Sequence, residues 1–413
     1  MTTHATNRKS KPGGLLVAFC MLFSLATETS AVAQAKYSIT DLGTLGGNNS
    51  IPYWITNTGD VIGVSDTDQF DSFGNPIDHA FRWSKGGMQD LGTLRDVDSV
   101  GLGGNDVGAT VGNNFYNINH ALLWYKGAVA GLGTLVGPSG YSWAQQINNA
   151  GQAVGGSEAA DGTFHAVLWN QGAVSDLGTL GGPNTSTYSL ANGINDLGQV
   201  VGDSQQDNIV NPLLGFPPFY PTLWDKGTVM KLGGEPSYAF AGDAYNINNK
   251  SVVVGRIVLA HPNEVAVAHA YIWEAGVMHD LGVPAGDDNS EANSLNDSGQ
   301  VVGDSGVGSI FNTPDHALLW ENGGWIDLNT LIAPGSGYYL IKAFDVNARG
   351  QIVVCSVQQS SGNIHAALLT PQPSNGSSGS SAAMAHYAPS LSDSARRLLL
   401  GVRGRKSGFR TEP

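Results

Sequence analysis

Short apolar segments recur along the chain, and each is bounded by glycine, asparagine or aspartate. The clearest has the pattern His-Ala-x-x-Trp, whose alternate positions suit the two faces of a β-strand. It recurs at His79, His120, His165, His269 and His316, and in altered form at Tyr220 and His365, with starts 41 to 55 residues apart. The 3.6-residue apolar period of a helical solenoid is absent. The pattern therefore predicts a chain built almost wholly from short strands.

Two further motifs recur in fixed order between these segments. Asp-Leu-Gly-Thr-Leu is found at Asp41, Asp90 and Asp176, shortens at Asp280, and drifts at Gly131, Lys231 and Asp327. Ile-Asn-x-x-Gly-Gln-Val-Val-Gly is clearest from Ile194 and Leu295, and is visible around Ile55, Gly104, Ile147, Ile247 and Val346. The Asn-x-x-Gly and Lys-Gly steps are typical of tight turns, so each unit reads as a four-stranded antiparallel meander. Seven units of this length predict an all-β, seven-bladed β-propeller.

The two ends of the repeat region complement each other. The segment Tyr37 to Gly43 is a fourth strand with no preceding three, and His365 to Thr370 is a third strand with no fourth. Pairing the N-terminal with the C-terminal strand would complete the last blade and remove an open edge. We therefore expect the ring to be closed by the ends of the chain.

The three motifs resemble those of the HAF-repeat family of bacterial extracellular repeat proteins, and His79-Ala80-Phe81 is a literal instance. The resemblance covers about residues 37–372, with departures at Tyr220, Lys231 and Leu369. It implies an exported repeat protein with a propeller-like fold and no established activity. It supplies no catalytic residues.

Both ends of the chain differ from the repeats. Residues 1–33 have a basic start, an apolar run and a small-residue site ending at Ala33, as in a signal peptide. Residues 34–372 are the propeller, and 373–413 are a Ser/Gly-rich linker with a basic, disordered or surface-attaching tail that contains a short possible helix. No later segment reaches 18 apolar residues, so we expect no transmembrane segment in the mature chain. The prediction is a secreted, extracellular or periplasmic monomer.

Charge excludes one class of partner. The chain has a net charge of −14, and residues 1–33 and 373–413 carry +2 and +4, so the central part carries about −20. Nucleic-acid binding depends on Lys and Arg that neutralise phosphates, and we therefore exclude it. Cys355 is alone in the mature chain, so no disulfide is expected.

The most variable segments are the connections from second to third strand, which in a meander leave the same face as the links between blades. They and their neighbours hold the candidate ligand-binding aromatic residues Phe115, Tyr116, Tyr141, Trp143, Phe216, Phe219 and Tyr338. These can stack on a sugar, and packing between loops explains them about as well. Asp66, Asp68 and Asp71 offer oxygen ligands to Ca²⁺, but they lack the glycine and terminal Glu of an EF-hand loop. The alternative is that these three aspartates are solvent-exposed carboxylates of turns and bind no metal.

Catalytic motifs are absent from the sequence. It has no Gly-x-Ser-x-Gly, His-Glu-x-x-His, phosphate-binding loop or Cys-x-x-Cys. The repeated histidines are expected to form structural hydrogen bonds between blades. An active site would need its catalytic residues only once, whereas these histidines recur from blade to blade. The leading hypothesis is a secreted module that binds an extracellular glycan or protein through the variable-loop face. The alternatives are a propeller lyase or hydrolase acting on polysaccharide, favoured by an unrepeated polar cluster at the channel, and a structural envelope protein.

Overall fold

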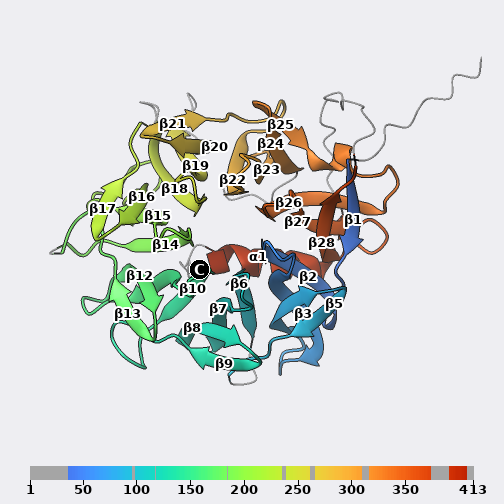
Figure 1. Cartoon of the computed structure of the whole chain (residues 1–413), viewed down its shortest axis with the longest axis horizontal. Helices are drawn as coiled ribbons and strands as arrows, with labels where there is room; N and C mark the ends of the chain where they lie inside the picture. The colour runs from blue at the N-terminus through green and yellow to red at the C-terminus, as the bar shows by residue number, and fades with distance from the viewer. Residues whose placement is uncertain are drawn as a thin grey trace, which may run out of the picture. The chain divides into compact units, whose positions relative to one another are not determined.

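The sequence motifs become seven antiparallel sheets arranged in a ring (Figure 1). This computed structural model describes residues 36–94, 98–116, 118–183, 185–234, 239–260, 266–308, 316–373 and 390–406. The predicted signal peptide, residues 1–33, lies outside them. Each sheet has four strands in chain order, apart from the last, so each unit of the repeat is one blade.

The blades are numbered along the chain. Blade 1 contains β2 (Gly46–Ile55), β3 (Val61–Phe70), β4 (Pro76–Ser84) and β5 (Gly87–Asp90). Blade 2 contains β6 (Ser99–Gly104), β7 (Thr110–Tyr116), β8 (Ile118–Tyr125) and β9 (Ala128–Gly131). Blade 3 contains β10 (Ser142–Ile147), β11 (Ala153–Glu158), β12 (Phe164–Asn170) and β13 (Ala173–Asp176). Blade 4 contains β14 (Ser189–Ile194), β15 (Val200–Gln205), β16 (Phe219–Asp225) and β17 (Thr228–Lys231).

The remaining blades follow the same order. Blade 5 contains β18 (Ala239–Ile247), β19 (Val253–Ala260), β20 (Ala266–Glu274) and β21 (Val277–Asp280). Blade 6 contains β22 (Asn289–Leu295), β23 (Val301–Gly306), β24 (His316–Glu321) and β25 (Gly324–Asp327), followed by the 3₁₀ turn η1 (Leu328–Leu331). Blade 7 contains β26 (Tyr338–Val346), β27 (Ile352–Gln358), β28 (Ile364–Pro371) and β1 (Tyr37–Asp41).

The predicted closure of the ring is confirmed. Strand β1 pairs antiparallel with β28, with Tyr37 opposite Pro371 and Asp41 opposite Ala367. The first strands of successive blades contact one another around the whole ring, including β2 with β26, so they form its inner wall. The N-terminal strand is the outer strand of blade 7.

The glycine of Val-Val-Gly is explained by an irregular register between the first two strands. In blade 4 the register shifts between Ala191 and Gly193, opposite Gly202. A Cβ atom at Gly202 would lie 1.9 Å from the carbonyl oxygen of Leu190. Blades 1, 2, 3, 5 and 6 show the same close approach, so the motif glycine is a requirement of this β-bulge.

The third-strand tryptophans join neighbouring blades. In blade 2 the Trp124 indole N–H donates to the carbonyl of Gly92, which follows the fourth strand of blade 1. Trp169, Trp224 and Trp273 make the same bond, at 3.1 to 3.2 Å. In blade 6 the donor is Trp325 of the fourth strand. A repeated aromatic residue thus serves as an inter-blade tie with its polar atom satisfied.

The Asn-x-x-Gly turn supplies a second tie, which we call the asparagine belt. The side-chain amide of Asn148 accepts from the backbone N–H of Gln152 in its own turn and donates to the carbonyl of Asn195 in the next blade. Six such amides donate across the blade junctions at 3.0 to 3.2 Å, from Asn105, Asn148, Asn195, Asn248, Asn296 and Asn347. The belt surrounds the ring on the face formed by the two turns of each blade, which we call the turn face.

The end of the chain contains the short helix expected there, packed on the ring rather than disordered. Residues Asp393–Lys406 form the helix α1, which contacts β2 and lies across the central region of the ring in Figure 1. Ala395, Leu398 and Leu399 are buried in the same apolar cluster as residues of blades 1, 2 and 7. The expectation of a disordered end is therefore corrected for residues 390–399. No helix in the described ranges is long and apolar enough to span a membrane.

Candidate functional site

The face opposite the asparagine belt carries the connections from second to third strand and the links between blades, and we call it the loop face. Of fifteen exposed large apolar side chains among the described residues, nine lie on these connections and a tenth, Phe70, ends the strand that leads into one. They are Phe70, Phe73, Leu94, Val136, Tyr141, Ile209, Val210, Leu213, Phe216 and Val307. Four of the ten belong to the connection between β15 and β16 in blade 4, the longest that the structure describes throughout.

Two of the predicted aromatic residues are open to solvent. Tyr141 is 44% exposed in the link that leads into blade 3, and Phe216 is 42% exposed in the long connection of blade 4. Both lie on the loop face, as predicted from strand direction. Blades 3 and 4 are neighbours in the ring, so this part of the loop face presents aromatic and aliphatic groups together.

The other aromatic candidates have contacts within the protein. Trp143 stacks on Phe164 of the same blade, with ring centroids 4.3 Å apart and planes 25° apart. Phe115 packs against the buried cluster that also holds α1. Phe219 is half-buried at the start of β16, and the side chain of Tyr116 lies outside the described ones. Sequence reasoning did not include Phe164, although it precedes a recurring His-Ala pair.

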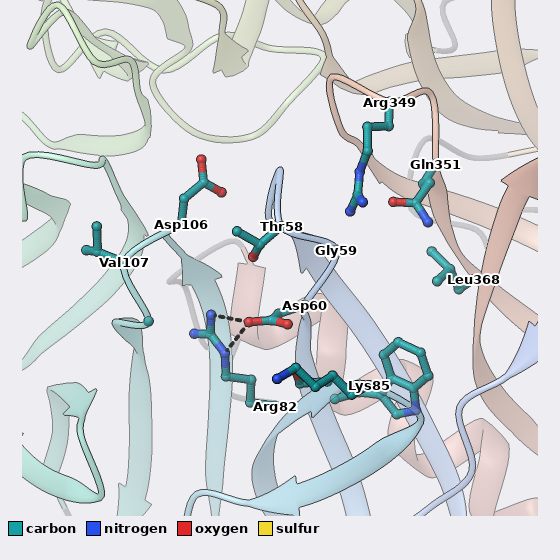
Figure 2. Close-up of a pocket in the computed structure, with 13 residues that line it drawn as sticks. Thr58, Gly59, Asp60, Arg82, Lys85, Asp106, Val107, Arg349, Gln351 and Leu368 are labelled. Carbon is teal, nitrogen blue, oxygen red and sulfur yellow. Dashed lines mark hydrogen bonds and ion pairs between the residues drawn. The ribbon is translucent and has the colours of Figure 1, made fainter.

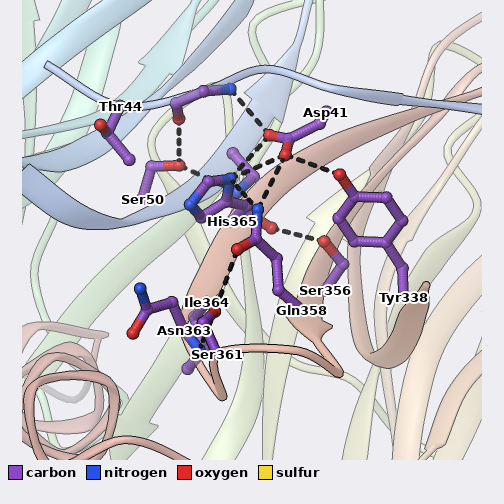
Figure 3. A network of polar contacts seen from close by, with 12 residues as sticks. Asp41, Thr44, Ser50, Tyr338, Ser356, Gln358, Ser361, Asn363, Ile364 and His365 are labelled. Atoms are coloured by element: carbon purple, nitrogen blue, oxygen red, sulfur yellow. Dashed lines mark hydrogen bonds and ion pairs between the residues drawn. The ribbon is translucent and has the colours of Figure 1, made fainter. Parts of the chain in front are cut away.

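Tyr338, the last aromatic candidate, belongs to a polar network in blade 7 (Figure 3). Its hydroxyl donates to Asp41 at 2.8 Å, and Asp41 also pairs with Nδ1 of His365 at 2.8 Å. Gln358 donates to the same carboxylate, and the backbone N–H of Gly43 donates to its other oxygen. Burial acts to raise the pKa of Asp41, but the hydrogen bonds from His365, Gly43 and Tyr338 outweigh it and lower the pKa to about 2.

A His–Asp pair of this kind is a repeated feature. His79 pairs with Asp90, His165 with Asp176 and His269 with Asp280, at 2.8 to 3.0 Å. Each pair joins the third and fourth strands of one blade, so the expectation of inter-blade bonds is corrected to bonds within a blade. In blade 7 the fourth strand comes from the N-terminus, and the pair there ties both ends of the chain together. Recurrence around the ring indicates a structural role.

The three predicted calcium ligands have different surroundings. Asp71 is exposed and accepts from the backbone N–H groups of Phe73 and Asn75, so it shapes its own turn. Asp68 is exposed, whereas Asp66 is buried and accepts from the Asn49 side-chain amide at 2.7 Å. Among the described residues, no group of three or more His, Cys, Asp or Glu is arranged to hold a metal ion.

Asp66 instead faces the C-terminal helix. It lies opposite Asp78 in the β3–β4 pairing, and Arg397 of α1 is 3.7 Å from Asp66 and 3.9 Å from Asp78. Burial is the largest cause that raises the pKa of Asp66, to about 6, and the neighbouring Asp78 adds to it. The backbone N–H of Ser392 donates to the carbonyl of Gly362 in the blade 7 connection. The helix therefore covers the loop face beside blades 7 and 1.

A charged group that the sequence analysis missed lies on the inner wall of blades 4 to 7. Arg256 pairs with Asp243 at 2.7 Å and with Glu291 of the next blade at 2.5 Å. Lys342 continues the chain of contacts, 3.5 Å from Glu291 and 2.6 Å from Asp304. The side chains of these groups are 9 to 21% exposed, and we call them, with Asp203, the charged wall.

The charged wall shifts the protonation of its members. Burial raises the pKa of Asp203 well above its usual range, and the neighbouring Asp243 adds to this. Burial likewise raises the pKa of Asp304, against the opposing effect of Lys342. One signal was visible in the sequence: the residue after the motif glycine is charged at positions 203, 256 and 304.

The fold defines the class, a seven-bladed β-propeller of four-stranded blades closed by its own ends. No protein-family model matches the sequence, and no curated protein matches it. Solved structures with a similar fold include YCF48 bound to D1 peptide, at 11% identity and TM-score 0.43, covering 84% of this chain and 100% of that one.

Two other solved structures are similar over most of their length. The β-propeller domain of the Trilobed protease from Pyrococcus furiosus is 7% identical, with a TM-score of 0.47, covering 75% of this chain and 89% of that one. Oligogalacturonate lyase from Vibrio parahaemolyticus is 10% identical, with a TM-score of 0.48. The match covers 80% of this chain and 93% of that one. At these identities the similarity concerns the fold alone.

Proposed function

We propose that this chain is an exported binding module that engages a protein partner through the loop face of blades 3 and 4. The observation that carries the proposal is the gathering of exposed apolar side chains on the loop-face connections. Water-exposed apolar groups on rigidly held loops are typical of surfaces that bind another protein. Export is supported by the signal-peptide pattern of residues 1–33, and the three repeat motifs support membership of the HAF-repeat family.

A protein partner suits these side chains better than a glycan does. Sugar binding favours flat aromatic rings free to stack, and of the six described candidates Tyr141 and Phe216 are open. Around them lie the branched aliphatic side chains of Ile209, Val210 and Leu213, which are 72%, 55% and 42% exposed. Such groups bury well in a protein interface and offer a sugar no hydrogen bond.

The proposed protein-binding surface is placed on blades 3 and 4 because α1 already covers another part of the loop face. The helix covers the loop face beside blades 7 and 1, through Gly362, Asp66 and Asp78. Blades 3 and 4 lie two and three places further along the ring from blade 1. We therefore assign the partner to these blades.

The test is a paired charge substitution, Ile209→Asp with Leu213→Asp, in the full chain. Partners are cross-linked from the medium and envelope of the producing cells, identified, purified and measured for affinity. A buried charge should weaken binding about tenfold or more, or ~1.4 kcal/mol. The control is Val277→Asp, an equally polar change at a 50% exposed position in β21.

Each outcome decides the proposal. Loss in the blade 4 variant with full binding by the control supports it. Equal binding by both variants would contradict the assigned surface, and binding to polysaccharides with no protein partner would favour the glycan hypothesis instead.

A second candidate is an enzyme acting on polysaccharide, favoured by the charged wall. This cluster is confined to one side of the ring, on the first and second strands of blades 4 to 7. Asp243, Glu291 and Asp304 are already paired with Arg256 or Lys342, and for this reason we rank it second. Cleavage of a polysaccharide by the native chain, lost in Glu291→Gln at unchanged stability, would reverse this order.

A further inference from the structure

Blade 1 departs from the other six blades at one place, and this departure marks a second surface. Six blades contribute an asparagine to the belt, but blade 1 has Thr56 at that position. The Thr56 hydroxyl bonds within its own turn, to Thr58 at 2.7 Å and to the backbone N–H of Asp60 at 3.0 Å. The belt is therefore interrupted at the junction of blades 1 and 2.

Two more departures occur at the same junction. The position of Arg82 in the third strand is leucine or isoleucine in the other six blades, and that of Asp60 is Gln, Ala or Val. Arg82 binds the Asp60 carboxylate at 2.7 and 3.1 Å and reaches blade 2, where it donates to the carbonyl of Ala109 and the hydroxyl of Thr110. An ion pair thus takes over the joining role of the missing amide.

A hollow of about 610 Å³ opens at this place on the turn face (Figure 2). Arg82 and Asp60 line it from blade 1, Asp106 from blade 2 and Arg349 from blade 7. Its volume is within the range of about 300 to 1,000 Å³ that small-molecule sites occupy. Two of the three departures from the repeat, Asp60 and Arg82, therefore line a cavity of ligand size.

The hollow presents two cations besides the paired Arg82. Arg349 lies in the turn of blade 7, and Figure 2 shows its guanidinium directed toward the turn that carries Gly59. A Cβ at Gly59 would lie 2.3 Å from the Arg349 Nη2 atom, so glycine leaves the space that this side chain uses. Lys85 lines the hollow from the second turn of blade 1. Among the described residues, neither side chain has an acidic partner within 4 Å.

The lining combines charge with an aromatic ring. Arg82, Lys85 and Arg349 outnumber Asp60 and Asp106, so the hollow carries a net positive charge on a propeller with a strongly negative total. An arginine guanidinium suits the two oxygens of a carboxylate, and the Trp83 indole in the lining suits the apolar face of a sugar ring. Together these groups match a sugar that carries a carboxylate.

We propose that the hollow at the junction of blades 7, 1 and 2 is a binding site for an acidic saccharide, with Arg349 and Lys85 pairing with a uronate carboxylate. Arg82 and Asp60 hold the wall of the site and join the blades. The site lies on the face opposite the proposed protein-binding loops and does not depend on them.

The repeat supplies matched controls for the test. Lys250 occupies in blade 5 the turn position of Arg349, and Lys126 occupies in blade 2 the position of Lys85. Calorimetric titration of the full chain with a uronic acid trisaccharide is compared for the native protein, Arg349→Ala, Lys85→Ala, Lys250→Ala and Lys126→Ala. A neutral trisaccharide, inorganic phosphate and sulfate are the other probes.

We expect the uronate to bind the native chain and both controls, and to bind Arg349→Ala about tenfold or more weakly, as for a lost charge-assisted pair. Binding should weaken with added salt, since the pairing groups are solvent-exposed. No uronate binding, equal binding of the neutral sugar, or phosphate binding as tight as uronate would each overturn the proposal. Unchanged affinity in both Arg349→Ala and Lys85→Ala would do so as well.

Discussion

The inner wall of the ring has two sides that differ at one position of the repeat. This position comprises the residue after the motif glycine in the second strand and the first-strand residue opposite it. In blades 1 to 3 the pairs are Ile51–Val64, Val100–Asn113 and Trp143–Gly156. In blades 4 to 7 they are Leu190–Asp203, Asp243–Arg256, Glu291–Asp304 and Lys342–Cys355. One fold position thus holds uncharged residues on one side and ionic groups on the other.

The C-terminal helix packs on apolar residues of the wall in blades 1 and 2. Ile51, Val64 and Val100 belong to the same buried cluster as Leu398 and Leu399 of α1. An apolar helix face gains by covering apolar side chains, and it would desolvate charges on the opposite side. The helix also packs on blade 7, where Cys355 of the same position belongs to the cluster. The ion pairs of Arg256 and Lys342 stay partly exposed to water.

The largest effect is expected on the charged side, for Arg256→Met. The change removes the cation shared by Asp243 and Glu291 and leaves two largely buried carboxylates. Losing one partner of a buried ion pair costs about 3–5 kcal/mol. Urea unfolding followed by tryptophan fluorescence measures it, with the exposed Lys126→Met as control.

A compensated variant sharpens this prediction. If the cost comes from uncompensated charge, adding Asp243→Leu and Glu291→Leu to Arg256→Met should restore most of the lost stability. An Arg256→Met chain as stable as the Lys126→Met control would show that the charged wall is not an electrostatic unit.

The fold could be predicted from the sequence because the same structural motifs recur in each blade. The motif glycine and the turn asparagine recur for reasons that operate within one or two blades, namely the β-bulge and the belt. The closure followed from Tyr37, which begins a strand with no preceding partners.

The site could be predicted much less well, because it depends on positions at which one blade differs from the others and on contacts between blades. Arg256 meets Glu291 across a blade junction, and Arg397 reaches Asp66 from the tail that follows the propeller. Such contacts follow from the ring geometry and leave no local pattern. Comparing equivalent positions between blades would have singled out Thr56, Arg82 and Arg256, whereas the search for aromatic residues selected side chains such as Trp143 that pack internally.

An intermediate effect is expected on the apolar side, for Leu398→Ala. This side chain is 1% exposed, and truncating a buried leucine costs about 2–5 kcal/mol, limited here to the free energy with which α1 docks. Hydrogen exchange should show faster exchange in α1 and unchanged protection of the blades. Arg396→Ala, on the exposed side of the helix, is the control. Equal exchange in both variants would show that the apolar wall does not hold the helix.

The smallest effect is expected for Asp203→Asn, and it depends on pH. Because burial and Asp243 raise the pKa of Asp203 in the folded chain, the folded state binds a proton that the unfolded state releases above about pH 4. The native chain should therefore lose stability as the pH rises through the folded pKa, and the asparagine variant should lose less. Unfolding free energies of the two should agree near pH 4 and differ at pH 8 in favour of the variant. Asn192 can still donate to the new side-chain oxygen, as it does to Asp203 at 2.8 Å. A pH curve for Asp203→Asn that runs parallel to the native curve would mean that Asp203 does not couple the charged wall to protons.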